Sequence, residues 1–381
     1  SVGLAQSTSG VAGALTGVGA DTTNNIKVDV SAIVSASSTP KSLLASSFNI
    51  YAEDTSKISS VVVGAAVSGS FSGSSTSASL AIGVSLAENN IDNDLTASAN
   101  NVLFGSLSVP TGNVTIKSKA NATITATSVA ASVAVALGSS GVSVSLSGGG
   151  ADAHNAVSGV TSATLIDTVI HSTGTVNLEA DNTSTIEATV VAVAASVSSG
   201  STAVGISIGA AISHNDIGTS SNRFVIESYL QNSKIVTSGA LSVLANNDMT
   251  ITAGVGAGAM AVALSSGTGI SGAGSGVNTT NNVYSKTAAY LKNNTDSSKA
   301  INASSVSINA LNTVTIDATA GSASLAFAAS QTAISIAVAA SLAYNTIDSQ
   351  VEAKVFGVQG GGSQILTDSM AGLAQDTATI T

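Results

Sequence analysis

Two glycine-rich segments of this sequence match patterns that are used in catalysis or nucleotide binding. Gly205 to Gly209 fits the Gly-x-Ser-x-Gly pattern of a serine nucleophile, but it lies within a predicted strand and lacks the strand–turn–helix context. Residues 267–272 fit Gly-x-Gly-x-x-Gly, yet no predicted helix follows, and no acidic residue lies about twenty positions further on. We therefore expect no catalytic residues and no cofactor site, and we do not predict an enzyme.

The residues that could bind a metal ion are few and scattered. His154 and His214 each precede a recurring Asn-x-Ile/Val motif, so a two-histidine site across neighbouring repeats is one interpretation. The other residues at this repeat position vary in type, which favours a solvent-facing column instead. Asp92, Asp94 and Asp152 could bind Ca²⁺ between subunits, but solvated surface charge is the favoured interpretation. The prediction is no metal site, with Ca²⁺ between subunits left open.

The composition excludes several classes of partner. Charged residues make up 8% of the chain, against about 25% in a typical soluble domain. The 11 Lys and Arg residues form no basic stripe, so no nucleic acid is expected, and with no Trp a polysaccharide-cleaving site is hard to build. Gly-Ser turns interrupt the uncharged runs 120–151 and 249–285, so no transmembrane segment is predicted. Glycans are possible at the Asn-x-Ser/Thr sequons of Asn113, Asn121, Asn182, Asn278, Asn293 and Asn302.

The stretch 176–188 recurs about every 65 residues and shows that this is a repeat protein. Its copies are 48–60, 114–126, 241–253, 306–318 and, shortened, 370–381. One column of the repeat is always isoleucine: Ile58, Ile124, Ile186, Ile251, Ile316 and Ile380. The Asn-x-Ile/Val marker supplies a second column: Asn24, Asn89, Asn155, Asn215, Asn281 and Asn345. We take these residues to form ladders along a stack.

The columns define one repeat domain over residues 1–381, with six units of about 65 residues. The units are about 1–47 (partial), 48–113, 114–175, 176–240, 241–305, 306–369 and 370–381 (partial). Apolar and polar residues alternate with a period of two, and helical periodicity is missing, which predicts an all-β fold. Each unit reads as about four strands. The polar column at Asn182 predicts a corner that divides its stretch into two short strands.

A β-solenoid or stack of β-arches, with parallel pairing between equivalent residues of successive units, is the favoured architecture. An antiparallel meander has the same inventory of strands and remains the alternative. Neither end of the sequence has a capping segment, and residues 370–381 together with 1–47 amount to nearly one unit. We therefore expect a head-to-tail homopolymer whose inter-subunit joint contains Ser1, Val2, Ile380 and Thr381. The other interpretation is that the boundaries cut a longer array of repeats.

The recurring Val-x-Ile-x-Ala-x-Asn-x-x-x-Ile-x-Ala stretch, followed by Ala/Gly-rich strands and Asn-x-Ile, resembles β-strand-repeat cell-surface proteins of bacteria and archaea. With its composition and uncapped ends, the chain looks most like the major sheath proteins of filamentous methanogenic archaea, which form amyloid-like tubular sheaths. This resemblance implies a structural protein that self-assembles into an extracellular sheath or filament enclosing and protecting cells. The alternative function is a repeat segment of a giant cell-surface adhesin. Because the sequence begins with Ser1, a removed secretory signal is expected.

Overall fold

The computed structural model describes residues 1–37, 42–292, 299–357 and 364–381. The regular elements in these ranges are all β-strands, so the predicted all-β class is confirmed. The strands are β1 (Val2–Ser7), β2 (Ala12–Ser35), β3 (Ser42–Leu43), β4 (Phe48–Asp54), β5 (Lys57–Ser72), β6 (Ser77–Asn100), β7 (Leu103–Phe104), β8 (Val114–Ala120), β9 (Thr123–Gly138), β10 (Val142–Ile166), β11 (Val169–Ser172), β12 (Val176–Ile217), β13 (Phe224–Gln231), β14 (Lys234–Thr237), β15 (Ala240–Lys292), β16 (Ile301–Ala329), β17 (Thr332–Phe356) and β18 (Ile365–Ile380).

Strand pairing in the described ranges is parallel throughout. Each strand pairs with its equivalent in the next unit, and the pairs join into one 18-stranded sheet. Phe48 of β4, for example, pairs with Val114 of β8, which in turn pairs with Val176 of β12. The predicted parallel stack of β-solenoid type is therefore confirmed, and the antiparallel meander is wrong.

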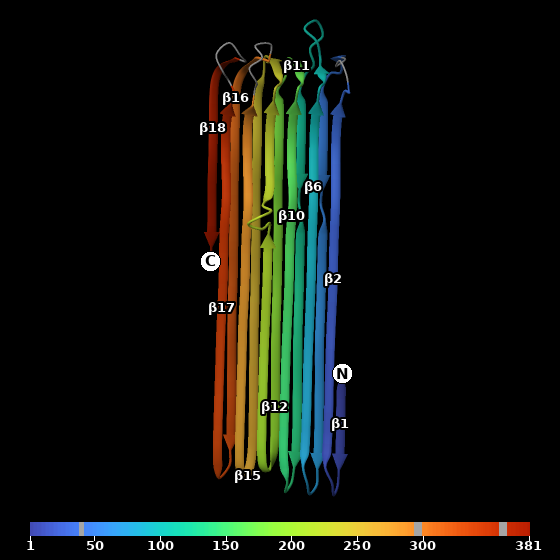
Figure 1. The fold of residues 1–381 in the computed structure, drawn as a ribbon, viewed down its shortest axis with the longest axis vertical. Helices are drawn as coiled ribbons and strands as arrows, with labels where there is room; N and C mark the ends of the chain where they lie inside the picture. Colours follow the sequence, from blue (N-terminus) through green and yellow to red (C-terminus); the bar gives the residue numbers. More distant parts are fainter. Residues whose placement is uncertain (38–41, 293–298, 358–363) are drawn as a thin grey trace.

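Each coil of the stack consists of two long legs that run in opposite directions (Figure 1). Short turns join the legs at one end, the turn end, and longer loops connect successive coils at the other, the loop end. First legs pair with first legs and second legs with second legs, so the sheet doubles back as two flat layers. The first legs of coils 1 to 6 are β1, β4–β5, β8–β9, the first part of β12, the first part of β15, and β16. The second legs are β2, β6, β10, the second part of β12 with β13, the second part of β15, and β17; β18 begins a seventh first leg.

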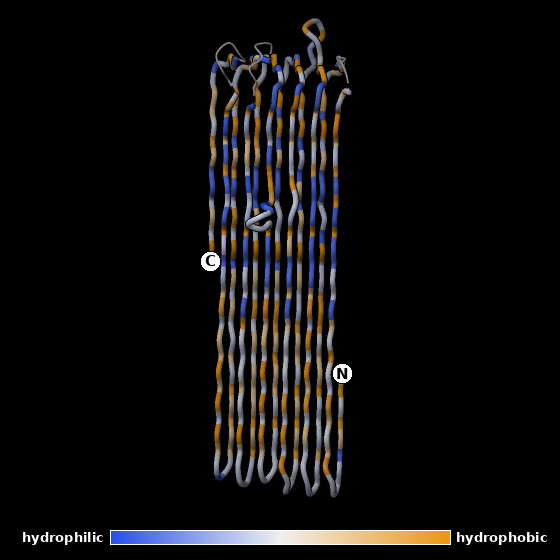
Figure 2. The backbone as a smooth tube through the Cα atoms, in the orientation of Figure 1, coloured by the Kyte–Doolittle hydropathy of each residue, from blue (hydrophilic) through white to orange (hydrophobic). Residues whose placement is uncertain are grey.

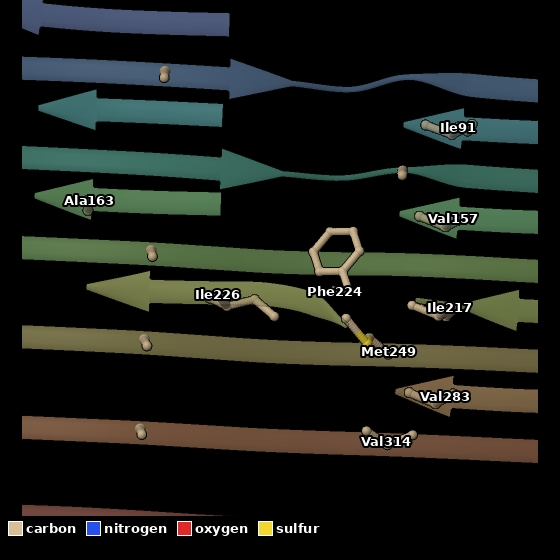
Figure 3. Close-up of a cluster of buried hydrophobic side chains, with 14 of the residues drawn as sticks. Ile91, Val157, Ala163, Ile217, Phe224, Ile226, Met249, Val283 and Val314 are labelled. Carbon is tan, nitrogen blue, oxygen red and sulfur yellow. The ribbon is translucent and has the colours of Figure 1, made fainter. Parts of the chain in front are cut away.

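Large apolar side chains fill the space between the layers in the half of each coil nearer the loop end, the loop half. Phe224 of β13 and Met249 of β15 are fully buried there, in one cluster with Ile217, Ile226 and Val314 (Figure 3). Alternate residues of a strand point to opposite faces, so the period of two read in the sequence places one apolar set inside. This cluster is the main hydrophobic core.

Small side chains hold the layers together in the other half, the turn half. Facing serine hydroxyls hydrogen-bond between the legs, as in Ser70–Ser77 at 2.7 Å and Ser68–Ser79 at 2.8 Å. Nearby, a Cβ atom on Gly83 would lie 2.5 Å from the carbonyl oxygen of Ala131 in the opposite layer. The layers therefore approach so closely that most residues between them are Gly, Ala or Ser, which accounts for much of the unusual composition.

The number of strands differs between units. Units 48–113 and 114–175 contain four strands each, as predicted, whereas unit 176–240 contains three. The Asn-x-Ile/Val marker does not separate strands, because it lies inside a continuous second leg in every coil but the fourth, where 218–223 interrupts the leg. The expected corner at Asn182 is wrong, since β12 runs without a break from Val176 to Ile217. Breaks at this column occur in coils 2 and 3 alone among the described residues, between β4 and β5 and between β8 and β9.

Candidate functional site

The asparagines of the Asn-x-Ile/Val marker form a ladder inside the stack. Each donates a hydrogen bond from Nδ2 to Oδ1 of the next asparagine, at 2.7–2.8 Å. The rungs are, in order, Asn24, Asn89, Asn155, Asn215, Asn281 and Asn345. Four of them, from Asn89 to Asn281, are buried. A buried amide needs partners for both its N–H groups and its oxygen, and an identical residue one coil away supplies them.

The column of Asn182 forms a second ladder, which explains why this residue does not make a corner. Asn182 is fully buried and donates to Asn247, which donates to Asn312, and Asn312 donates to Asp376. A polar residue is tolerated inside the first leg because the coil above satisfies it. The isoleucine column lies four residues further along the same leg. Its members pair in register from Ile58 to Ile380.

The residues of the expected joint lie at opposite ends of the stack. Val2 of β1 pairs with Val67 of coil 2, and the Ser1 amino group donates to the carbonyl of Ala65. At the far end, Ile380 pairs with Ile316, and the Thr381 N–H donates to the Ile316 carbonyl. All of these residues belong to first legs. β18 occupies the rows near the loop end, whereas β1 occupies the rows near the turn end.

Charged side chains gather on the outer surfaces of the loop half and form rungs between coils. The Lys27 ammonium lies 2.6 Å from the Asp92 carboxylate, and Lys117 lies 2.8 Å from Glu179. The hydrogen bond from Lys27 lowers the pKa of the Asp92 carboxyl below its usual value. Exposed ion pairs of this kind add little stability.

The outer surfaces of the turn half are apolar, as the predominance of orange over blue there shows (Figure 2). Val61 of the first legs is 70% exposed, and Ile208 of the second legs is 58% exposed. In this half the strands have small or hydroxyl residues inside and Val, Ile or Leu outside, the reverse of an ordinary soluble sheet. These apolar surfaces were not predicted from the sequence. The signal was present in the alternation of β12, where Ile206, Ile208 and Ile212 share one parity with His214.

The one group of three potential metal ligands found among the described residues is His154, His214 and Asp216. The two imidazole rings stack at 4.9 Å between coils 3 and 4, and His214 Nε2 lies 2.9 Å from an Asp216 oxygen. The donor atoms lie within 4.8 Å of one another. Zinc ligands sit about 2.0–2.2 Å from the metal, so these side chains would have to move closer together to share an ion. His154 is exposed, in line with the solvent-facing interpretation.

The aspartates considered for Ca²⁺ do not form one site. Asp92 pairs with Lys27 and accepts from the Ser158 hydroxyl, while Asp94 accepts from the backbone N–H of Val160. Asp152 lies in the row of Leu86, six positions away from the row of Asp92. Burial raises the pKa of the Asp152 carboxyl although His154 and His214 oppose the shift.

His171, the isolated histidine, is buried in β11. Its Nδ1 has no hydrogen-bond partner among the described residues. Burial, together with the positive charge of Lys234, lowers the pKa of this imidazole. Both effects favour the neutral form of the imidazole.

The two glycine-rich motifs and the glycosylation sequons lie in ordinary parts of the fold. Ser207 of the Gly-x-Ser-x-Gly match is buried between the layers in β12, and residues 267–272 form part of a turn and the following strand segment of β15. Of the sequons, Asn182 is buried in its ladder, whereas Asn113, Asn121 and Asn302 are exposed. Asn278 is half-buried, and Asn293 lies outside the described residues.

No helix in the described ranges has the length and apolarity that crossing a membrane requires. Comparison of the chain with protein-family models, with curated proteins and with solved structures found no match.

Proposed function

We propose that this chain is a structural protein whose copies stack through β-strand pairing into an extracellular sheath or filament that encloses and protects cells. The two ends of the stack support this proposal. β2, of 24 residues, pairs with β6 along one edge, and β17, of 25 residues, pairs with β15. Neither has a partner for its other edge within the described ranges. Long flat edges of this kind recruit further strands.

The asparagine ladder carries the proposal because its two ends are complementary. Every rung donates in the same direction, from the lower to the higher residue number. The ladder therefore ends with the Oδ1 acceptor of Asn24 at one end and the Nδ2 donor of Asn345 at the other. Stacking the β2 edge of one copy on the β17 edge of another would join donor to acceptor and extend the ladder unbroken.

Head-to-tail stacking also accounts for the positions of β1 and β18. In the stacked arrangement, β18 of one copy and β1 of the next occupy loop-end and turn-end rows of the same first leg. Ile380 and Thr381 then lie in one layer with Ser1 and Val2, which is the predicted joint. Such contacts are heterologous and generate filaments or closed rings.

The protective role rests on the chemistry of the stack. Backbone hydrogen bonds continue from coil to coil, and the interior of the turn half is packed with small side chains, as in other cross-β assemblies. With 11 Lys and Arg residues in 381, trypsin has few sites to attack. We expect the assembled material to resist trypsin, heat and denaturant.

The extracellular location rests on the resemblance to cell-surface repeat proteins. Labelling of unbroken source cells with antibodies to the chain tests it.

Proline at the open edge of β2 tests the stacking. Ala12 and Ala36 donate their N–H groups to the coil 2 backbone, so even-numbered residues of β2 face β6 and odd-numbered residues face the open edge. Asn25→Pro with Ser31→Pro removes two edge donors without removing a hydrogen bond within the chain. We expect the refolded native sequence to form filaments by electron microscopy with a meridional spacing of about 4.8 Å. The proline variant should keep its circular dichroism but form no filaments.

A matched variant, Asn25→Thr with Ser31→Thr, changes the same side chains and keeps both N–H groups, so it should still polymerise. Filaments formed by the proline variant would contradict the proposal. A native sequence that stays monomeric at high concentration would also do so, and would favour the alternative of a repeat segment within a giant adhesin.

A further inference from the structure

The outer surface of the second legs is corrugated in the turn half. Coils 2, 4 and 6 present large apolar side chains there in the first and third of three rows, with Val or Ala in the second: Ile82, Val84 and Leu86, then Ile208, Ala210 and Ile212, then Val338, Ala340 and Leu342. At the same rows, coils 1, 3 and 5 present Gly17, Gly19 and Asp21, then Gly148, Gly150 and Asp152, then Gly274, Gly276 and Asn278. Ridges therefore alternate with grooves, with a repeat of two coils or about 9.6 Å.

Nothing within the described chain requires glycine in these grooves. A Cβ atom on Gly17, Gly150, Gly274 or Gly276 would meet no atom within 4 Å, and none of these residues has a left-handed backbone. Glycine weakens a strand because it has no side chain to pack and loses more conformational freedom. Glycine occurs in the same rows of all three grooves in spite of this loss of stability. We take this to indicate that something outside the chain approaches the backbone there.

The ridges are as unusual as the grooves. Their Ile, Val and Leu side chains at the first and third rows are 42–61% exposed. Glycine is the expected residue where another backbone or a close-fitting surface comes near a strand. A surface that offers both exposed apolar ridges and empty apolar grooves of the same period is complementary to itself.

We propose that this corrugated face docks against the same face of a second copy of the chain, with ridges of one inserted in grooves of the other. A two-fold axis parallel to the strands, midway between coils 3 and 4, places coil 1 over coil 6, coil 2 over coil 5 and coil 3 over coil 4. In these three rows every ridge then faces a groove, in an isologous contact. The facing sheets form a dry interdigitated interface of the steric-zipper type.

The corrugated rows form a small face. Five residues along each of six strands span about 16 Å by about 29 Å, an area of about 460 Å² per copy. A standard stable interface buries about 800 Å² on each partner, so we expect one pair of copies to associate weakly, at high protein concentration, and the contacts to add up along a filament. Asp21, Asp152 and Asn278 form the border row next to the charged loop half, where they can reach water.

The inference deepens the proposed function, because lateral docking would join stacks into a wall, but it can be tested without filaments. In the edge-blocked chain (Asn25→Pro with Ser31→Pro), we expect a dimer by sedimentation equilibrium. Filling one groove by Gly274→Val with Gly276→Val should return the chain to a monomer. β-branched residues favour strands, so this variant should fold at least as well. The matched control is Gly254→Val with Gly256→Val, which adds the same atoms to open positions on the first-leg part of β15 and should leave the dimer intact.

The outcomes separate the two proposals. A monomeric edge-blocked chain, or a groove-filled chain that remains dimeric, would overturn the docking. A monomer that floats with neutral phosphatidylcholine vesicles would assign the face to lipid instead and overturn it too. A dimer that disappears on groove filling supports the docking even if the native sequence forms no filaments. Filaments without lateral pairing would leave head-to-tail stacking standing alone.

Discussion

At the scale of single residues, the asparagine ladder links polar groups that an isolated coil could not bury. Asn155 accepts from Asn89 and donates to Asn215, both at 2.8 Å, and all three are buried. The ladder is therefore a property of the stack, and each rung depends on its neighbours.

Removing a central rung should destabilise the fold more than removing a terminal one. Asn155→Ala leaves an unpaired donor on Asn89 and an unpaired acceptor on Asn215, at a cost of about 1–3 kcal/mol for each buried group. Asn24→Ala removes the donor to one acceptor, the Oδ1 of Asn89, and it does so at the half-buried end of the ladder. Urea unfolding of the edge-blocked, groove-filled chain, which is expected to be a monomer, measures the difference. Asn49→Ala, at an exposed position of β4, is the control. Equal losses for Asn155 and Asn24 would contradict a cooperative ladder.

His171 should make the fold sensitive to mild acid. Its pKa is lowered in the folded chain, so the unfolded chain binds a proton first as the pH falls below the ordinary value of about 6.5. Stability is therefore fully present above that pH and is lost as the pH falls toward the folded pKa. His171→Gln removes the proton-binding group and should flatten the pH dependence of urea unfolding between neutral and mildly acidic pH. His154→Gln, at an exposed position, serves as the control; a slope that persists in His171→Gln would refute the assignment.

At the scale of the leg, the face to which a residue points decides which substitutions the strand tolerates. Gly149 and Gly150 are neighbours in β10 and point to opposite faces. A Cβ on Gly149 would lie 2.8 Å from the Val193 carbonyl oxygen in the opposite layer, whereas one on Gly150 would meet nothing within 4 Å. The close approach of the layers thus depends on the inner glycine alone.

This adjacent pair gives opposite expectations for the same chemical change. Gly149→Ala forces the layers apart and should lower the free energy of unfolding by about 1–3 kcal/mol, the usual cost of overpacking. Gly150→Ala should raise it by about 0.5–1 kcal/mol, because alanine restricts the unfolded chain and fits the strand. Thermal unfolding of the edge-blocked chain that also carries Gly274→Val and Gly276→Val, which is expected to be a monomer, measures both. Similar effects of the two substitutions would show that the layers are not in contact at this level.

The sequence predicted the columns of this fold better than its strands. Identical residues at equal spacing, such as Ile124 and Ile186, must lie above one another in a parallel stack, so the pairing followed from periodicity. The number of strands did not follow, because Asn182 reads locally as a corner and is satisfied only by Asn247 in the next coil. The alternation of ridges and grooves could not be predicted from the sequence for another reason. Units differ in length at their turns, so the rows of Gly148 and Ile208 align only once the register is known.

At the scale of the whole molecule, the stack is a one-dimensional array in which each coil contacts mainly its neighbours. Such arrays tolerate the loss of complete repeats, because every coil presents the same edge to the next. Phe48, Val114 and Val176 occupy one column, so deletion of residues 114–175 joins coil 2 to coil 4 in register. The corrugation, in contrast, has a period of two coils, and six is an even number of coils. Ridges and grooves would therefore continue in phase from one copy to the next along a head-to-tail filament.

The two periods make deletions of one and two units behave differently. Deleting residues 114–175 removes the groove of coil 3 and places the ridges of coils 2 and 4 side by side. The two-fold axis then sets the ridge of coil 4 against the same ridge of the second copy, so the chain should fold and stack but lose lateral docking. Deleting residues 114–240 removes one ridge and one groove, and coils 1, 2, 5 and 6 keep the alternation; this shorter chain should stack and dock. Circular dichroism reports folding, electron microscopy reports stacking, and sedimentation of the edge-blocked forms reports docking. Because the shorter chain has the smaller face, its docking cannot be attributed to area. A one-unit deletion that still docks, or a two-unit deletion that folds but does not, would show that the alternation of glycine and Ile/Val/Leu is not what joins the copies.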